Sequence, residues 1–241
     1  MTTNPDTVSL HTLENQPLDT ESGILRSLIK QMRDRDMEML AHGDRTARFA
    51  VALGSALGLE GTALIELQHA GLLHDIGKLT VPDTLLRKKG PLTADEYVLV
   101  QSHPRAGARL LESFPVLHGP AILIAHHHEH WNGSGYPFGL RGEMIPLGSR
   151  ILAVADAFDA LTSGHSTRFA HDKDTALRLL HALAGSQLEP KLVTLWDALA
   201  RRLPSLHGTQ SVDERLEGGL CLPALIEWGP SACCGGPPLP P

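Results

Sequence analysis

Residues 125–146 read AHHHEHWNGSGYPFGLRGEMIP and concentrate side chains that bind metals. Three consecutive histidines are followed by a carboxylate, a fourth histidine and a turn-rich loop that contains Tyr136 and Pro137. A hydrophobic core has little use for so many imidazoles, and imidazole clusters of this density usually bind transition metals. The alternative interpretation is a chance histidine-rich end of a helix.

Composition predicts one all-α domain. The chain has 241 residues, enough for a full core. Ala and Leu dominate and alternating runs of β-branched residues are missing, which favours helices. The net charge of −6 argues against a nucleic-acid polymer as partner, because phosphate binding needs a basic surface. A small anionic ligand stays open, since bound metal ions would dominate the local field.

Cysteine use and the N-terminus predict the compartment. Cys221, Cys233 and Cys234 all lie near the C-terminus, which suits a reduced cytosol better than a disulfide scaffold. The N-terminus has no apolar signal-peptide core, and no apolar run approaches the length of a membrane span. We therefore expect a cytoplasmic protein without a membrane partner.

Apolar periodicity predicts a helical domain over residues 19–204, between a flexible segment at 1–18 and a Gly/Pro-rich tail at 205–241. The tail has room for one short helix near residues 222–228. The expected helices begin near residue 19, span 37–57 before Gly58, span 62–74 before Gly77, start at the Thr93–Glu96 capping box, start at His103, and span 120–128, 148–163, 175–184 and 190–202. Residues 80–91 read as an extended loop.

Acidic and imidazole side chains recur in these helices. Glu38 and His42 are four residues apart and share a helix face, although a solvated pair would look the same. His74 and Asp75 are neighbours that diverge by about 100° on a helix, yet they can still flank one ion. His103 stands at a helix start, where a histidine is more often a surface residue.

The stretch GSRILAVADAFDALTS at 148–163 is apolar on nearly every face, so it is expected to be the central buried helix. An unpaired buried carboxylate costs several kcal/mol and needs a metal, a cation or hydrogen-bond donors. Asp156 is flanked by apolar residues and is the better candidate for such a site. An exposed edge of the helix fits Asp159 better than Asp156.

The order and spacing of these strings resemble the HD-GYP family, a branch of the HD-domain metal phosphohydrolases. The resemblance covers about residues 34–202 and rests on HDIGK, VPDTLLRKKGPLT, the His103–Pro104 pair, HHEHWNGSGYPFGLRGEMIP and RILAVADAFDALTS. It implies an HD-type helical bundle with a GYP loop beside a buried site for two or three metal ions.

The same resemblance implies the ligand set. The family's His-His-Glu string falls on residues 127–129, which leaves His126 outside the ligands. The implied ligands are His42, His74, Asp75 and Asp156 for the core site, with Asp75 bridging two ions, His103 and His127 for the second ion, and Glu38 and His128 for a third. Ions in such enzymes are iron or manganese, in agreement with ligands that include no thiolate.

The activity that the resemblance implies is hydrolysis of cyclic di-GMP to linear pGpG or GMP by a metal-activated hydroxide. Asp75 and Lys78 are the implied catalytic residues. Contacts to the substrate are implied for Lys78, Tyr136, Pro137, Asp159 and Arg168. A diguanylate cyclase is a further partner that the family suggests.

One segment departs from the family pattern. Where the family reads Arg-Pro-Tyr-Arg, this chain has His165, Ser166, Thr167 and Arg168. A lost charge-assisted contact is worth roughly 1.5–3 kcal/mol, so the departure bears on substrate identity and affinity. Two alternatives therefore stay open: a phosphohydrolase for another cyclic dinucleotide or nucleotide, and a non-catalytic module that docks a diguanylate cyclase.

Overall fold

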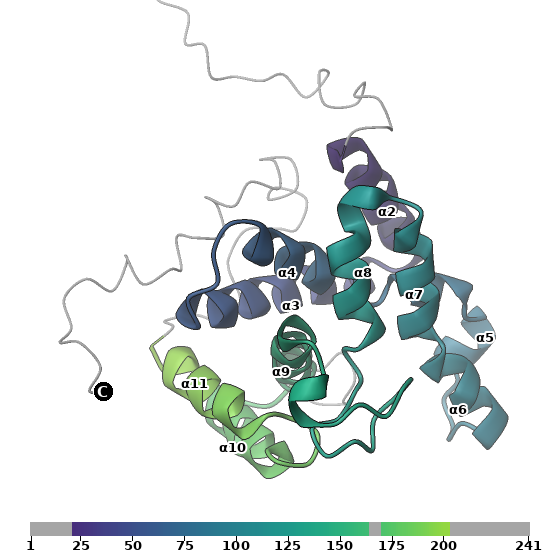
Figure 1. Ribbon diagram of the computed structural model, residues 1–241. Coiled ribbons are helices and arrows are strands. Elements are labelled where there is room, and N and C mark those ends of the chain that lie inside the picture. Colours follow the sequence, from purple (N-terminus) through teal and green to yellow (C-terminus); the bar gives the residue numbers. More distant parts are fainter. Residues whose placement is uncertain (1–20, 164–169, 203–241) are drawn as a thin grey trace, which may run out of the picture.

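The computed structural model describes residues 21–163 and 170–202, and within them the fold is all-α, as expected (Figure 1). The α-helices are α2 (Glu21–Arg35), α3 (Met37–Ala56), α4 (Thr62–Leu73), α5 (Asp83–Leu86), α6 (Ala94–Gln101), α7 (His103–Glu112), α8 (His118–Ala125), α9 (Leu147–Ser163), α10 (Lys173–Leu183) and α11 (Pro190–Ala200). Three 3₁₀ turns complete it: η1 (Ile76–Thr80), η2 (Pro115–Leu117) and η3 (Gly142–Met144). The predicted segments at 1–18 and 205–241, including the helix near 222–228, lie outside the described residues.

Helix α9 is the central buried helix, as its apolar sequence predicts. It lies in the middle of the bundle in Figure 1 and packs against α3, α4, α8, α10 and α11. Phe158 in α9 meets Phe49 of α3 and Trp196 of α11, with ring centroids 5.1–5.4 Å apart. These three aromatic rings bring α3, α9 and α11, which are far apart in sequence, together in one core.

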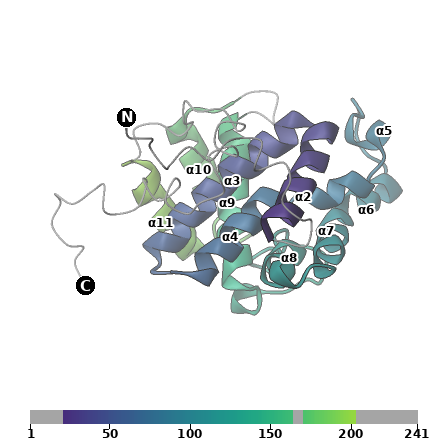
Figure 2. The same ribbon diagram turned by 90° about the horizontal axis from the view of Figure 1, so that it is seen from above.

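Helices α3 and α4 run side by side and approach very closely (Figure 2). Glycines permit this approach, because a Cβ atom added at Gly43 would lie 2.4 Å from the Leu72 carbonyl oxygen. A Cβ at Gly71 would lie 2.4 Å from the Ala47 Cα atom. Since both obstacles are backbone atoms, the two helices can meet at this distance only where one of them has a glycine.

Several boundaries confirm the sequence signals. The first helix was expected to begin near residue 19, and α2 buries five apolar residues at spacings of three and four: Ile24, Leu25, Leu28, Ile29 and Met32. Asp36 caps α3 through the Glu38 N–H, and Gly58 follows that helix at a φ of 81°. The Thr93–Glu96 capping box opens α6.

Other expectations were wrong. Gly77 does not stop α4, which ends at Leu73. It lies inside η1, where a Cβ would sit 1.9 Å from the His103 carbonyl oxygen, so its role is close packing on α7. Residues 80–91 include the short helix α5 as well as loop, and α8 begins two residues before Pro120. Asp159 is fully buried, so the exposed edge expected for it does not exist.

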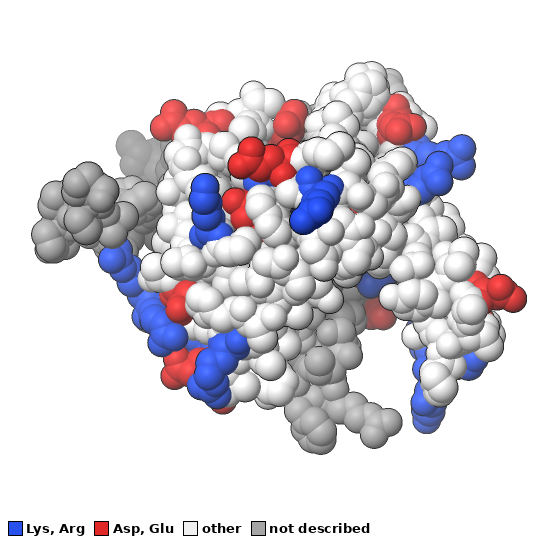
Figure 3. All heavy atoms as spheres, turned by 60° about the horizontal axis from the view of Figure 1, so that its bottom comes forward, with Lys and Arg blue, Asp and Glu red and all other residues white. Residues whose placement is uncertain are grey.

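Helices α5 and α6 form a lobe at one edge of the molecule. None of the residues of α6 is buried, and Tyr97, Val98 and Leu99 are among the exposed apolar side chains. Figure 3 shows this lobe separated from the rest of the surface by a hollow, with basic and acidic side chains interspersed around it.

Among the described residues, no helix is long and apolar enough to cross a membrane.

Candidate metal centre

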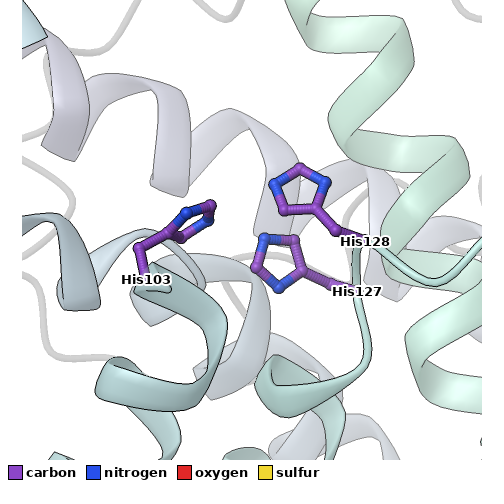
Figure 4. Close-up of side chains that lie close together, drawn as sticks. All are labelled: His103, His127 and His128. Atoms are coloured by element: carbon purple, nitrogen blue, oxygen red, sulfur yellow. The ribbon is translucent and has the colours of Figure 1, made fainter. Parts of the chain in front are cut away.

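The predicted ligands come from distant parts of the chain and meet at one place. His42 lies on α3, His74 and Asp75 directly follow α4, and Asp156 lies on α9. These four form what we call the first ligand group. The second ligand group is His103, at the start of α7, with His127 and His128, which follow α8 (Figure 4).

Ligand atoms in the first group converge closely. The Nε2 atom of His42 lies 3.2 Å from Nε2 of His74 and 3.1 Å from Oδ1 of Asp156. Oδ2 of Asp75 lies 3.6 Å from Nε2 of His74 and 4.0 Å from Nε2 of His42. Ligand atoms ~2.1 Å from one ion lie about 3.0 Å apart at right angles and about 4.2 Å apart when opposite. The four side chains therefore have the spacing of one coordination sphere.

Asp75 lies between the two groups. Its Oδ2 atom faces His42 and His74, while its Oδ1 atom is 3.5 Å from Nε2 of His103. One carboxylate thus presents an oxygen to each group, which is the arrangement that a bridging ligand requires.

The second group consists of three imidazoles whose ligand nitrogens all lie within 4.8 Å of one another. Figure 4 shows the three rings gathered in one space, with His127 and His128 approaching from the segment after α8 and His103 from α7. The family resemblance implies that His127 binds a second ion and His128 a third, and the ligand nitrogens of all three histidines are close enough to share one ion.

Three histidines have the same local geometry at helix ends. His74, His103 and His127 each follow the end of a helix by one or two residues. Each places Nδ1 2.7–2.8 Å from the carbonyl oxygen three residues earlier, of Gly71, Val100 and Ile124 respectively. A carbonyl only accepts, so Nδ1 carries the proton and Nε2 carries the lone pair. The contact also supplies a donor to a carbonyl in the last turn of the helix, where intrahelical N–H partners run out.

Two of these Nε2 atoms are buried without a partner. Within the described residues, Nε2 of His103 and Nε2 of His127 have no hydrogen-bond partner. An unpaired buried acceptor costs about 1–3 kcal/mol, so native proteins rarely retain one. Lone pairs that face other histidines and a shared carboxylate fit a divalent cation, and the donor set of imidazole and carboxylate suits a first-row metal. The residues present therefore fit the metal site that the sequence predicts.

The electrostatics of the two groups differ. Burial acts to lower the pKa of His42, but Asp156, Asp159 and Asp75 outweigh it and raise that pKa to about 10. Burial lowers the pKa of His128 to about 3, and it also lowers the pKa of His103 and His127. The second group is therefore neutral imidazole at neutral pH, the protonation state that binds metal ions.

Lys78 lies beside the bridging carboxylate. Its Nζ atom is 2.6 Å from Oδ2 of Asp75. Burial would lower the pKa of Lys78, but Asp75 and other carboxylates raise it, so the ammonium stays charged. Burial would raise the pKa of Asp75, and Lys78 with the nearby histidines holds it well below its usual range. A fixed cation therefore lies next to the predicted ions.

The loop that carries Tyr136 and Pro137 is held against the second group. The ring of Tyr136 lies over His128 with centroids 5.0 Å apart, and its backbone N–H donates to the His128 carbonyl. The buried carboxylate of Glu129 accepts from the backbone N–H groups of Phe138, at 2.7 Å, and Leu140, at 2.9 Å. Glu129 therefore fixes the path of the loop, a role that its place beside the histidines does not predict.

Some predicted residues lie outside the two groups. Glu38 is partly exposed and pairs with Arg45, whose Nη2 atom lies 2.8 Å from Glu38 Oε1. His126 lies outside both groups, as expected, and its ring packs against Phe138. Asp159 is buried behind His42 rather than exposed toward a substrate. Arg168 and the altered motif at residues 165–168 lie outside the described residues.

Two partly buried ion pairs near the site were not predicted. Arg45 pairs with Asp159 across 114 positions of sequence, and Arg150 donates to Glu189, at 2.5 Å, and to the Ile145 carbonyl. A basic residue within an otherwise buried helix, such as Arg150 in α9, was the available signal.

Comparison with known proteins agrees with this geometry. Residues 26–192 match the HD domain. The chain belongs to the HD domain family. The resemblance drawn from the sequence is thereby confirmed. The HDG"Y"P protein Bd1817 from Bdellovibrio bacteriovorus has the same HD fold, with a TM-score of 0.58, 20% identity, and coverage of 79% of this chain and 67% of that one.

Two curated HD-domain relatives are enzymes by name. The chain is 39% identical over 189 residues to the cyclic di-GMP phosphodiesterase response regulator RpfG of Xanthomonas campestris pv. campestris, covering 78% of this chain and 49% of that protein. It is 35% identical over 185 residues to the 3'3'-cGAMP-specific phosphodiesterase 2 of Vibrio cholerae serotype O1, covering 74% and 35%. The chain thus spans half or less of the length of these relatives.

Proposed function

We propose that this chain is a metal-dependent phosphodiesterase that hydrolyses a cyclic dinucleotide, with cyclic di-GMP as the first candidate and residues 19–204 as the catalytic unit. The observation that carries the proposal is the convergence of the two ligand groups on the shared carboxylate of Asp75. The names of the curated relatives support the substrate class.

The two ligand groups would hold two divalent ions, with iron or manganese as the candidates. Ions bound there would supply a nucleophile from water at neutral pH and neutralise charge on the phosphodiester. Glu38 contacts Arg45 instead of either ligand group, so it would have to reach the site as well in order to bind a third ion. Two ions are therefore the number that the observed groups favour.

The chain's own residues account for the rest of the reaction. Lys78 places a charged ammonium beside Asp75, where it can contact a phosphate oxygen or stabilise the departing oxygen. Tyr136 covers the face of His128 and forms one wall of the space where a nucleotide would lie. Glu129 holds that wall in place through two backbone N–H groups.

A panel of cyclic dinucleotides tests the proposal. Metal-loaded protein is incubated with cyclic di-GMP, 3'3'-cGAMP and cyclic di-AMP, and products are separated by chromatography. We expect linear dinucleotide or mononucleotide from at least one of them. Asp75→Ala should lose both metal retention and turnover, because it removes an oxygen from each group. The matched control, Asp174→Ala, changes an exposed aspartate on α10 and should keep both.

The outcomes also separate the alternatives. Turnover of 3'3'-cGAMP alone would favour a phosphohydrolase for a cyclic dinucleotide other than cyclic di-GMP. The names of the cGAMP-specific relatives support this alternative. No turnover of any cyclic dinucleotide by protein that retains its ions would overturn the enzyme proposal. That result would favour a module that docks a diguanylate cyclase.

A further inference from the structure

We propose that Asp159 and Arg45 position His42 for metal binding and so strengthen the binding of an ion at the first ligand group. The inference rests on the proposed metal-dependent function and assigns Asp159 a role other than contact with substrate. It concerns how a buried carboxylate and a partly buried guanidinium, both outside the coordination sphere, set the properties of one ligand.

The contact between Asp159 and His42 determines the tautomer of the imidazole. Oδ2 of Asp159 lies 2.7 Å from Nδ1 of His42, and the carboxylate is completely buried. Because the carboxylate accepts, Nδ1 carries the proton when His42 is neutral, and the Nε2 lone pair is directed at His74 and Asp156. Asp159 thus directs the metal-binding nitrogen into the first group.

Arg45 keeps Asp159 charged and fixed. The guanidinium contacts both carboxylate oxygens, with Nε 2.7 Å from Oδ1 and Nη2 3.1 Å from Oδ2. A buried carboxylate without a cation would be costly and would tend to protonate. The same guanidinium reaches Glu38 at its outer side, so its orientation is fixed from two directions.

His42 differs in this respect from three other histidines of the site. His74, His103 and His127 donate to neutral backbone carbonyls. A carboxylate acceptor increases the basicity of a metal-bound imidazole more than a neutral carbonyl does. The ligand groups are therefore unequal, and removing such a carboxylate typically weakens metal binding 10–100-fold, an order of magnitude taken from other metal sites.

Ion affinities measured site by site test this inference. Full-length metal-free protein is titrated with Co²⁺ against a competing chelator while the visible absorption of the bound ion is followed. His128→Ala identifies the absorption that belongs to the second group. Asp159→Asn should weaken binding at the first group by about 10–100-fold and leave the second group unchanged. The matched control, Asp174→Asn, should change neither.

A second variant keeps the test decisive if Asp159→Asn folds poorly. Arg45→Met combined with Asp159→Asn removes both buried charges together and should recover the unfolding temperature, yet the first group should still bind weakly. A folded double variant with wild-type affinity at both groups would overturn the inference. Equal losses at both groups would do the same, since they would indicate only a structural role.

These outcomes are distinct from failure of the proposed function. Wild-type protein that binds two ions but hydrolyses no cyclic dinucleotide would overturn the enzyme proposal alone. In that case the affinities of the variants would still decide whether Asp159 and Arg45 position His42.

Discussion

Replacing Gly71 by alanine should separate the two helices that carry the first ligand group. The added Cβ would lie 2.4 Å from the Ala47 Cα atom and 2.8 Å from the Ala47 nitrogen. Ordinary contact begins near 3.4 Å, so α4 has to move away from α3 by about 1 Å. Because the obstacle is backbone, no side-chain rotation can absorb the overlap.

The shift has two measurable consequences. Overpacking of this kind costs about 1–3 kcal/mol, which for a domain of this size lowers the unfolding temperature by roughly 2–12 °C. The Nε2 atoms of His42 and His74, now 3.2 Å apart, would separate with their helices, so the affinity of the first group for its ion should also fall. Unfolding followed by circular dichroism in excess chelator isolates the packing cost, and chelator competition measures the ion.

The chain offers a matched glycine as control. A Cβ at Gly90 meets nothing within 4 Å, and this glycine has no positive φ, so Gly90→Ala should leave both quantities unchanged. If Gly71→Ala unfolds at the wild-type temperature and binds both ions normally, then the close approach of α3 and α4 does not position the ligands, and the reasoning fails.

Two further predictions concern the loop and pH. Glu129→Gln removes the charge from the acceptor of the Phe138 and Leu140 N–H groups. Each of these two charge-assisted hydrogen bonds is worth about 1.5–3 kcal/mol, so both should weaken. Hydrogen exchange at residues 132–142 should therefore speed up and KM should rise, while the exposed Glu143→Gln changes neither; unchanged exchange would refute the role of Glu129. Metal-free protein should be most stable near pH 6.5, as measured by urea unfolding in chelator. Burial lowers the pKa of His128 to about 3 in the folded chain. Between about pH 6.5 and 3 the unfolded chain therefore binds a proton at His128 that the folded chain does not, and stability falls as the pH falls. Above pH 6.5, His42 keeps its proton to about pH 10 only in the fold, so stability is lost as pH rises, and a steady gain between pH 6.5 and 10 would contradict this assignment.

The members of the two ligand groups were predictable because their types and order are distinctive, as with HDIGK and the histidines at 127 and 128. Helices such as α2 and α9 followed from apolar periodicity and are confirmed. The environment of Asp159 was not predictable, because its partner His42 lies 117 positions away and no periodicity reports on such a contact. Gly77 was misread for the same reason, since the atom that requires a glycine there belongs to His103.

The helix-end histidines have a consequence for how such a centre can change. His74, His103 and His127 each obtain their orientation from a carbonyl of the adjacent helix, three residues earlier. Ring orientation is therefore a local property that travels with the segment, whereas the spacing between rings depends on how the segments pack. Engineering of metal preference should accordingly leave the histidines intact and vary the small residues between helices, Gly43 and Gly71 above all. The orientation of each imidazole is then set by its own segment, and the packing of the helices sets the distances between the ligand nitrogens.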